Sequence, residues 1–123
     1  MSDLITPELA KKLKGASPEV RLRAAELLEK AKQAEEIEKA QTSYMGFVKY
    51  MWPAFIQGRH HKIMAEAFER IARGELKRLI VNMPPRHTKS EFASYLLPAW
   101  FLGQMPEKKI IQTAHTAELT VGF

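Results

Sequence analysis

The spacing of apolar residues changes part-way along this chain, and that change most constrains the fold. Residues 60–73 carry apolar side chains every three or four positions, which predicts a helix closed by Gly74. The compact apolar run Leu76–Asn82 instead predicts a strand buried on both faces. A helix over Ser90–Leu102 and a second strand over Lys108–Ala114 follow. Strands alternating with helices are typical of a doubly wound parallel sheet, so we expect an α/β fold.

Three residues refine the later elements. We expect Pro98 to kink its helix and Gly103 to end it. Thr116 is placed to cap a further helix that runs to Phe123. The sequence thus predicts strand, loop, helix, strand and helix in that order.

An all-helical leader, residues 1–43, is expected to precede this pattern. Thr6-Pro7-Glu8 predicts a first helix that stops at Gly15, and Ser17-Pro18-Glu19 predicts a longer one reaching about Ala40. The apolar stripe of the longer helix is narrow and rich in alanine: Val20, Ala24, Leu27, Leu28, Ala31, Ala34 and Ile37. Such a stripe favours docking on a partner or another domain, and a solvated surface helix is the equal alternative.

Charge is distributed unevenly between the leader and the rest of the chain. Bases and acids balance over residues 1–43, so the whole net charge of +5 lies from Tyr44 onward. This asymmetry indicates an anionic ligand, either nucleotide, nucleic acid or acidic lipid, with a merely soluble basic protein as the alternative.

Composition excludes several classes of protein. Cysteine is absent, which rules out disulfides, thiolate metal sites and thiol nucleophiles and favours a reducing compartment. No apolar run approaches the roughly 20 residues that a bilayer requires, and the start of the chain lacks the pattern of a signal peptide. We therefore expect neither secretion nor a membrane partner.

Aromatic residues cluster directly after the leader, where Pro53 interrupts any helix. The cluster comprises Tyr44, Phe47, Tyr50, Trp52 and Phe55. Core packing is the simplest interpretation of this stripe, and contact with a nucleic-acid or nucleotide base is the alternative.

The segment Asn82–Ser90 is the one that suggests chemistry. It lies between the first expected strand and a helix, where a loop can receive phosphate at the N-terminal end of the helix. Lys89 can neutralise the β- and γ-phosphates, and the hydroxyl of Ser90 can ligate the Mg²⁺ that bridges them. An ordinary strand-to-helix turn that happens to contain Lys-Ser is the alternative.

This segment departs from the phosphate-loop pattern G-x-x-x-x-G-K-S/T at both glycines. Met83 and Thr88 occupy those positions. Because Pro84 and Pro85 have no N–H, an anion must be held by the amides of residues 86–90. A β-branched residue such as Thr88 is poorly suited to a positive φ, so it is the doubtful point of the loop.

The residues "LIVNMPPRHTKSE", with "GRHHKIMAEAFERIARGELKR" before them and "KKIIQTAHTAELTVGF" after them, resemble the ATPase domain of large terminase subunits from tailed bacteriophages. Those motors pump DNA into a preformed capsid. Their loop commonly reads Met-Pro-Pro-Arg-His-Gly-Lys-Ser, which Thr88 departs from. The resemblance covers about residues 44–123. It implies an incomplete RecA-like P-loop sheet, residues 44–123, that precedes the catalytic acids and the nuclease domain of the family.

The resemblance also implies roles for individual residues. Lys89 and Arg86 would be catalytic, the arginine by stabilising the transition state of phosphoryl transfer. ATP would be held by the loop residues Pro85, Arg86, His87, Thr88, Lys89 and Ser90, with Mg²⁺ on Ser90. Gln57 and His61 would contact adenine, with surface or capping roles as the alternative. The corner at Thr113–Thr116 resembles the next family motif, or is simply a capped turn.

Partners follow from the same resemblance: double-stranded DNA, a small terminase subunit, the portal and further copies in a ring. The location would be the host cytoplasm, transiently on the procapsid portal. Two other interpretations stay open: a helicase-like P-loop ATPase, and a basic DNA- or partner-binding module without catalysis.

The acids that such a motor requires are absent from the sequence. Asp3 is the only aspartate, and the acids beyond Lys89 are Glu91, Glu107 and Glu118. We therefore expect a piece of a motor, with weak nucleotide affinity and ATP turnover near zero for this chain alone.

Overall fold

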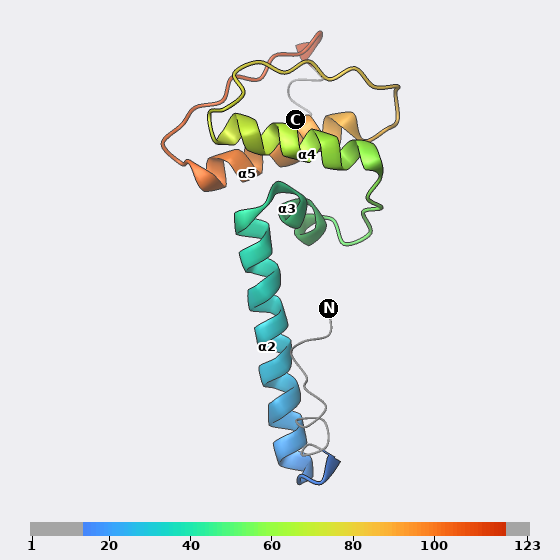
Figure 1. Ribbon diagram of the computed structural model, residues 1–123, viewed down its shortest axis with the longest axis vertical. Coiled ribbons are helices and arrows are strands. Elements are labelled where there is room, and N and C mark those ends of the chain that lie inside the picture. Colours follow the sequence, from blue (N-terminus) through green and yellow to red (C-terminus); the bar gives the residue numbers. More distant parts are fainter. Residues whose placement is uncertain (1–13, 118–123) are drawn as a thin grey trace. The chain divides into compact units, whose positions relative to one another are not determined.

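The structure, a computed structural model, describes residues 14–117, and within them the chain is all-helical. The chain divides into two compact units, Met1–Ile37 and Glu38–Phe123. Figure 1 labels the helical elements α2 (Pro18–Thr42), α3 (Tyr44–Met51), α4 (Arg59–Ala72), the π-helical segment η1 (Glu91–Leu96) and α5 (Leu97–Gln104).

Helix α2 confirms the longer helix expected in the leader. Pro18 is its first residue, where a missing N–H costs nothing, and the Ser17 hydroxyl accepts a long hydrogen bond of 3.4 Å from the Val20 amide. The expected apolar stripe is largely exposed, with Val20 at 53% and Leu27 at 60% of full exposure. Ala40 is the one buried residue of α2.

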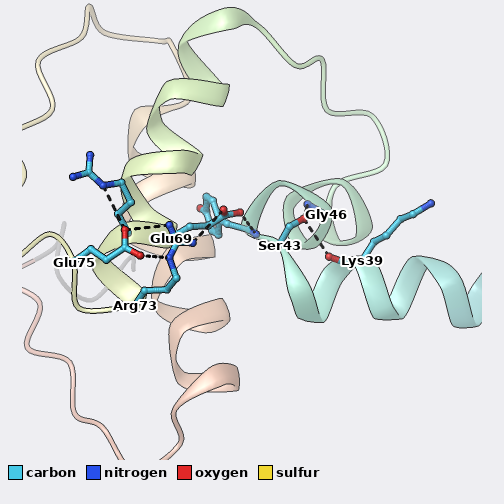
Figure 2. Close-up of polar contacts among 8 residues, drawn as sticks. Lys39, Ser43, Gly46, Glu69, Arg73 and Glu75 are labelled. Atoms are coloured by element: carbon cyan, nitrogen blue, oxygen red, sulfur yellow. Dashed lines mark hydrogen bonds and ion pairs between the residues drawn. The ribbon is translucent and has the colours of Figure 1, made fainter.

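A tight turn joins α2 to α3. The Ser43 hydroxyl accepts a hydrogen bond from the Gly46 amide at 3.0 Å and donates one to the Lys39 carbonyl at 3.3 Å (Figure 2). A Cβ atom at Gly46 would lie 2.2 Å from that carbonyl oxygen. Only glycine therefore allows the two helices to approach so closely.

Aromatic rings form the centre of the core, as the sequence predicted for Tyr44. Its ring is fully buried and makes edge contacts with Phe68, Phe92 and Trp100 at centroid distances of 5.5, 5.1 and 5.4 Å. Helix α3 thereby packs against α4 and α5. As expected, α3 ends just before Pro53, with Trp52 as its C-cap.

The end of α4 is tied to the start of α3 by a carboxylate. Glu69 Oε1 accepts a hydrogen bond of 2.9 Å from the Tyr44 amide, one of the unpaired amides of the α3 N-terminus. Arg73, the C-cap of α4, donates to Glu75 at 2.7 Å (Figure 2). Gly74 follows with φ +76°, which confirms it as the residue that closes the helix.

The expected helix over Ser90–Leu102 forms, but its first part is wound as a π-helix. The Phe92 carbonyl accepts from the Leu97 amide, five residues on, and also from the Tyr44 hydroxyl. Pro98 has no N–H for the Ser94 carbonyl, and the Gln112 side chain donates to that carbonyl instead at 3.2 Å. The π-helical turns thus lie directly before Pro98, and α5 runs on to Gln104, one residue past Gly103, so Gly103 does not end the helix as we expected.

Neither expected strand forms, so the α/β fold and its P-loop parallel sheet are wrong. Leu76–Asn82 and Lys108–Ala114 lack regular secondary structure, and no strand occurs within residues 14–117 (Figure 1). Ile80 and Ile111 are 84% and 91% exposed, although we expected Leu76–Asn82 to be buried on both faces. An apolar run favours a strand only where a neighbouring strand pairs with its backbone, and neither run has such a neighbour in the described part of the chain.

Two expected elements lie outside the described residues: most of the first leader helix, Thr6–Gly15, and the helix from Thr116 to Phe123. Across residues 14–117, no helix is both long and apolar enough to cross a membrane.

Candidate phosphate-binding loop

The loop before η1 has an unusual backbone. Arg86 and Thr88 have φ angles of +64° and +55°, and they are the non-glycine residues with positive φ among those described. His87 between them does not share this conformation, and Lys89 begins the helical stretch that continues into η1. Left-handed and other conformations therefore alternate over residues 86–89.

Alternation of left-handed and right-handed helical residues turns successive N–H groups toward one side of the chain and makes an anion-binding concavity known as a nest, and the positive φ angles at Arg86 and Thr88 fit this pattern. The His87 amide closes the turn over Pro85 and Arg86, whereas within residues 14–117 the amides of Arg86, Thr88, Lys89 and Ser90 have no protein acceptor. Two of these amides, at Lys89 and Ser90, belong to the first turn of the helical stretch, where N–H groups have no intrahelical partner. The loop thus offers backbone donors to a ligand.

Holding Thr88 in this conformation is costly. A left-handed residue with a Cβ atom costs about 1–2 kcal/mol, and β-branching makes it less favourable still. The sequence raised this doubt about Thr88, and the structure places the residue at positive φ nonetheless. Surrounding groups must therefore stabilise it.

Thr88 is held at both its carbonyl and its side chain: the carbonyl accepts a hydrogen bond of 2.9 Å from the Phe92 amide, and the hydroxyl contacts His61. The Nε2 atom of His61 lies 2.6 Å from Thr88 Oγ1, which in turn donates to the His87 carbonyl at 2.7 Å. His61 Nδ1 accepts a hydrogen bond of 2.9 Å from the Gly58 amide. An Nδ1 that accepts leaves the proton of a neutral imidazole on Nε2. That proton faces two neighbours, Thr88 Oγ1 at 2.6 Å and His60 Nε2 at 3.0 Å, and we assign it to the nearer threonine oxygen.

The surroundings of His61 favour this neutral form. Its side chain is 5% exposed, and its ring packs against Phe55 and Phe92 at centroid distances of 4.7 and 5.3 Å. Burial lowers the pKa of His61 below its ordinary value of 6.5, and the nearby His60 and His87 lower it further. Protonation would also point an N–H at the Gly58 amide.

Three histidines therefore meet beside the loop. The Nε2 atoms of His60 and His61 lie 3.0 Å apart, and the ring centroids of His60 and His87 lie 6.1 Å apart. His87 Nδ1 also lies 3.0 Å from the Pro85 carbonyl. No group of three or more ligating side chains in the described part of the chain could hold a metal ion.

The remaining predicted site residues differ in position. Pro85, Arg86, His87 and Ser90 are exposed on the loop, and Lys89 is half-buried. Gln57 is half-buried in the segment before α4, and among the described residues it makes no hydrogen bond to the loop. The structure thus brings His61 to the loop but gives no such contact for Gln57.

Sequence analysis missed two residues beside the loop, His60 and Gly58. The adjacent histidines 60–61 at the start of a predicted helix were a usable signal, because the side chain of a third helical residue can reach back to the amide before the helix.

Comparison with protein-family models, with curated proteins and with solved structures finds no match to this chain.

Proposed function

We propose that residues 84–90 bind the phosphates of ATP, and that the chain is the nucleotide-binding part of a DNA-packaging motor of the terminase kind. The observation that carries the nucleotide proposal is the pair of positive φ angles at Arg86 and Thr88, directly before Lys89-Ser90. A nest followed by an ammonium and a hydroxyl is the arrangement that phosphate and its magnesium require.

The residues present fit a magnesium nucleotide. The unpaired amides among residues 86–90 would hold phosphate oxygens, Lys89 would neutralise their charge, and the exposed hydroxyl of Ser90 would ligate Mg²⁺. Arg86 lies exposed on the same loop, where a guanidinium can reach a bound anion. Magnesium would supply charge neutralisation of the phosphates. None of these contacts depends on a parallel sheet, because nest and side chains belong to one continuous segment.

We expect binding without appreciable hydrolysis from this chain alone. Phosphoryl transfer requires a carboxylate that organises the metal or the attacking water. Glu91 and Glu107 are exposed, and among the described residues neither forms a hydrogen bond or ion pair with the loop. A steady-state assay of phosphate release should therefore show no DNA-stimulated turnover.

The proposed motor context defines the partners. Double-stranded DNA, a small terminase subunit, the portal and further copies of the chain in a ring belong to this proposal, as does a location in the host cytoplasm. The exposed stripe of α2, which includes Val20 and Leu27, supports a docking role for the leader. Deletion of residues 1–37 should then prevent assembly of the holoenzyme, and unchanged assembly would count against it.

Loss of nucleotide binding on mutation of Lys89 tests the central claim. Mg·ATP at about a hundredfold excess over its Kd should stabilise the chain by roughly 2.7 kcal/mol, seen as a rise in Tm. Lys89→Ala should abolish most of that rise. The control Lys49→Ala removes an exposed lysine in α3 and should keep the rise. Inorganic triphosphate should stabilise the wild type as well, because the loop contacts only phosphate.

A basic binding module is the second candidate, and charge distribution favours it. Lys77, Arg78, Lys108 and Lys109 are exposed beside the apolar runs that we expected to be strands. Such a module would bind DNA with a strong salt dependence. DNA binding that is unaffected by Lys89→Ala, together with no effect of nucleotide on Tm, would support the module over the motor.

A further inference from the structure

The left-handed conformation of Thr88 requires a stabilising contact, and a residue of α4 provides it. His61 lies in the first turn of α4, 27 residues before Thr88, and it is buried by the same core that buries Phe92. Its ring contacts Phe55, which precedes it in the sequence, and Phe92, which follows it. The donor that faces Thr88 is therefore fixed by packing rather than by the loop itself.

Both ring nitrogens of His61 form hydrogen bonds within the protein. Nδ1 accepts from the Gly58 amide, and Nε2 donates to Thr88 Oγ1. The threonine hydroxyl then donates to the carbonyl of His87. This chain of donors and acceptors runs in one direction from the start of α4 into the loop, so it is complete only when His61 is neutral.

We propose that His61 is a positioning residue that holds Thr88 at positive φ and so keeps the anion nest formed. The proposal rests on the proposed function for its effect on nucleotide binding, but not for its effect on the loop. On this proposal, the hydrogen bonds of the Thr88 hydroxyl compensate for the absence of glycine at this position. It also replaces the adenine contact expected of His61, because both ring nitrogens are engaged within the protein.

Two substitutions of His61 separate its two hydrogen bonds. In His61→Asn, the amide oxygen can replace Nδ1 and keep the bond to Gly58, but nothing reaches Thr88. In His61→Gln, the longer amide can replace Nε2 and keep the bond to Thr88, but the bond to Gly58 is lost. If the bond to Thr88 determines the loop conformation, His61→Asn should disturb that conformation and His61→Gln should preserve it.

The backbone of Thr88 gives a direct readout in solution. In the full chain labelled for NMR, the three-bond HN–Hα coupling and the Cα shift of Thr88 report its φ angle without any ligand. We expect left-handed values in the wild type and in His61→Gln, and a shift toward extended values in His61→Asn. Affinity for Mg·ATP should fall about fivefold in His61→Asn, the effect of losing one hydrogen bond.

Thr88→Gly tests whether the effect passes through this residue. Glycine adopts positive φ without help, so this variant should bind Mg·ATP at least as tightly as the wild type. Adding His61→Asn to Thr88→Gly should then change affinity less than twofold. Tyr44→Phe is the matched control, because it removes another buried hydrogen bond, to the Phe92 carbonyl, and should lower Tm without altering the φ of Thr88.

The outcomes separate this inference from the proposed function. If Thr88 keeps its left-handed values in His61→Asn, or if His61→Asn weakens binding equally in the Thr88→Gly background, the positioning role is wrong. If no variant and no wild-type sample binds Mg·ATP, the proposed function fails while the NMR comparison still decides the role of His61.

Discussion

Helices α2 and α4 differ in how many of their residues are buried. Helix α2 has 25 residues and buries only Ala40. Helix α4 has 14 residues and buries His61, Met64, Ala65 and Phe68. The shorter helix therefore buries four residues, whereas the longer one buries a single residue.

This difference in burial indicates what stabilises each helix. Helix α2 is rich in Ala, Leu, Glu and Lys, whose intrinsic propensities favour helix without tertiary support. Helix α4 is stabilised by its buried face, as most helices in proteins are. Only a helix fixed in this way can hold a side chain such as His61 in a constant position, so a site is expected beside α4 rather than along the exposed part of α2.

The largest test of this comparison is to shorten one apolar side chain in each helix. Phe68→Ala in α4 should lower the free energy of unfolding by about 3–5 kcal/mol, because it leaves a cavity beside Tyr44. Leu27→Ala in α2 should change it by less than about 0.5 kcal/mol, since that side chain is exposed. Urea unfolding followed by tryptophan fluorescence measures both. Equal losses would mean that the exposed stripe of α2 is covered in solution.

A second test concerns the turn between α2 and α3. Gly46→Ala places a methyl group against the Lys39 carbonyl, a contact that the backbone can relieve only by moving. We expect a loss of about 1–3 kcal/mol, the range for overpacking, measured by the same unfolding curve. Gly103→Ala is the control, because a Cβ there meets nothing within 4 Å and alanine favours helix. A loss at Gly103 as large as that at Gly46 would contradict this account.

Local sequence signals predicted the helices well and the overall fold poorly. Capping residues such as Ser17 and Gly74, and the break at Pro53, act through bonds within a few residues, so their effects can be inferred from the sequence. The two expected strands at Leu76–Asn82 and Lys108–Ala114 depend on distant backbone partners that no local pattern specifies. Periodicity identified apolar runs there, but it could not supply the neighbours that a sheet requires.

The candidate site shows the same limit. The loop could be located from Lys89 and Ser90, because their chemistry is intrinsic to the residue types. The contact between His61 and Thr88 joins residues 27 positions apart, and it depends on a core whose rings come from four helical elements. Sequence reasoning correctly identified Thr88 as the doubtful residue but could not find its stabilising partner.

A third prediction uses pH to sharpen the role of α4. The pKa of His61 is lowered in the folded chain, so the unfolded chain takes up a proton first as pH falls below about 6.5. The free energy of unfolding should therefore decrease on acidification from pH 7.5 to pH 5.5. His61→Asn removes this group and should make the decrease smaller than in the wild type. Identical pH dependence in the two proteins would argue that His61 does not titrate differently on folding.

The smallest expected effect separates intrinsic propensity from packing. Ala31→Gly in α2 and Ala67→Gly in α4 make the same chemical change, and glycine costs about 1 kcal/mol relative to alanine within a helix. In α4 that cost should appear in the global unfolding curve, because the helix is part of the core. In α2 it should appear as faster amide hydrogen exchange near Ala31, with the midpoint of global unfolding unchanged, since local opening there breaks few buried contacts. A shift in that midpoint for Ala31→Gly would show that the exposed part of α2 unfolds together with the core.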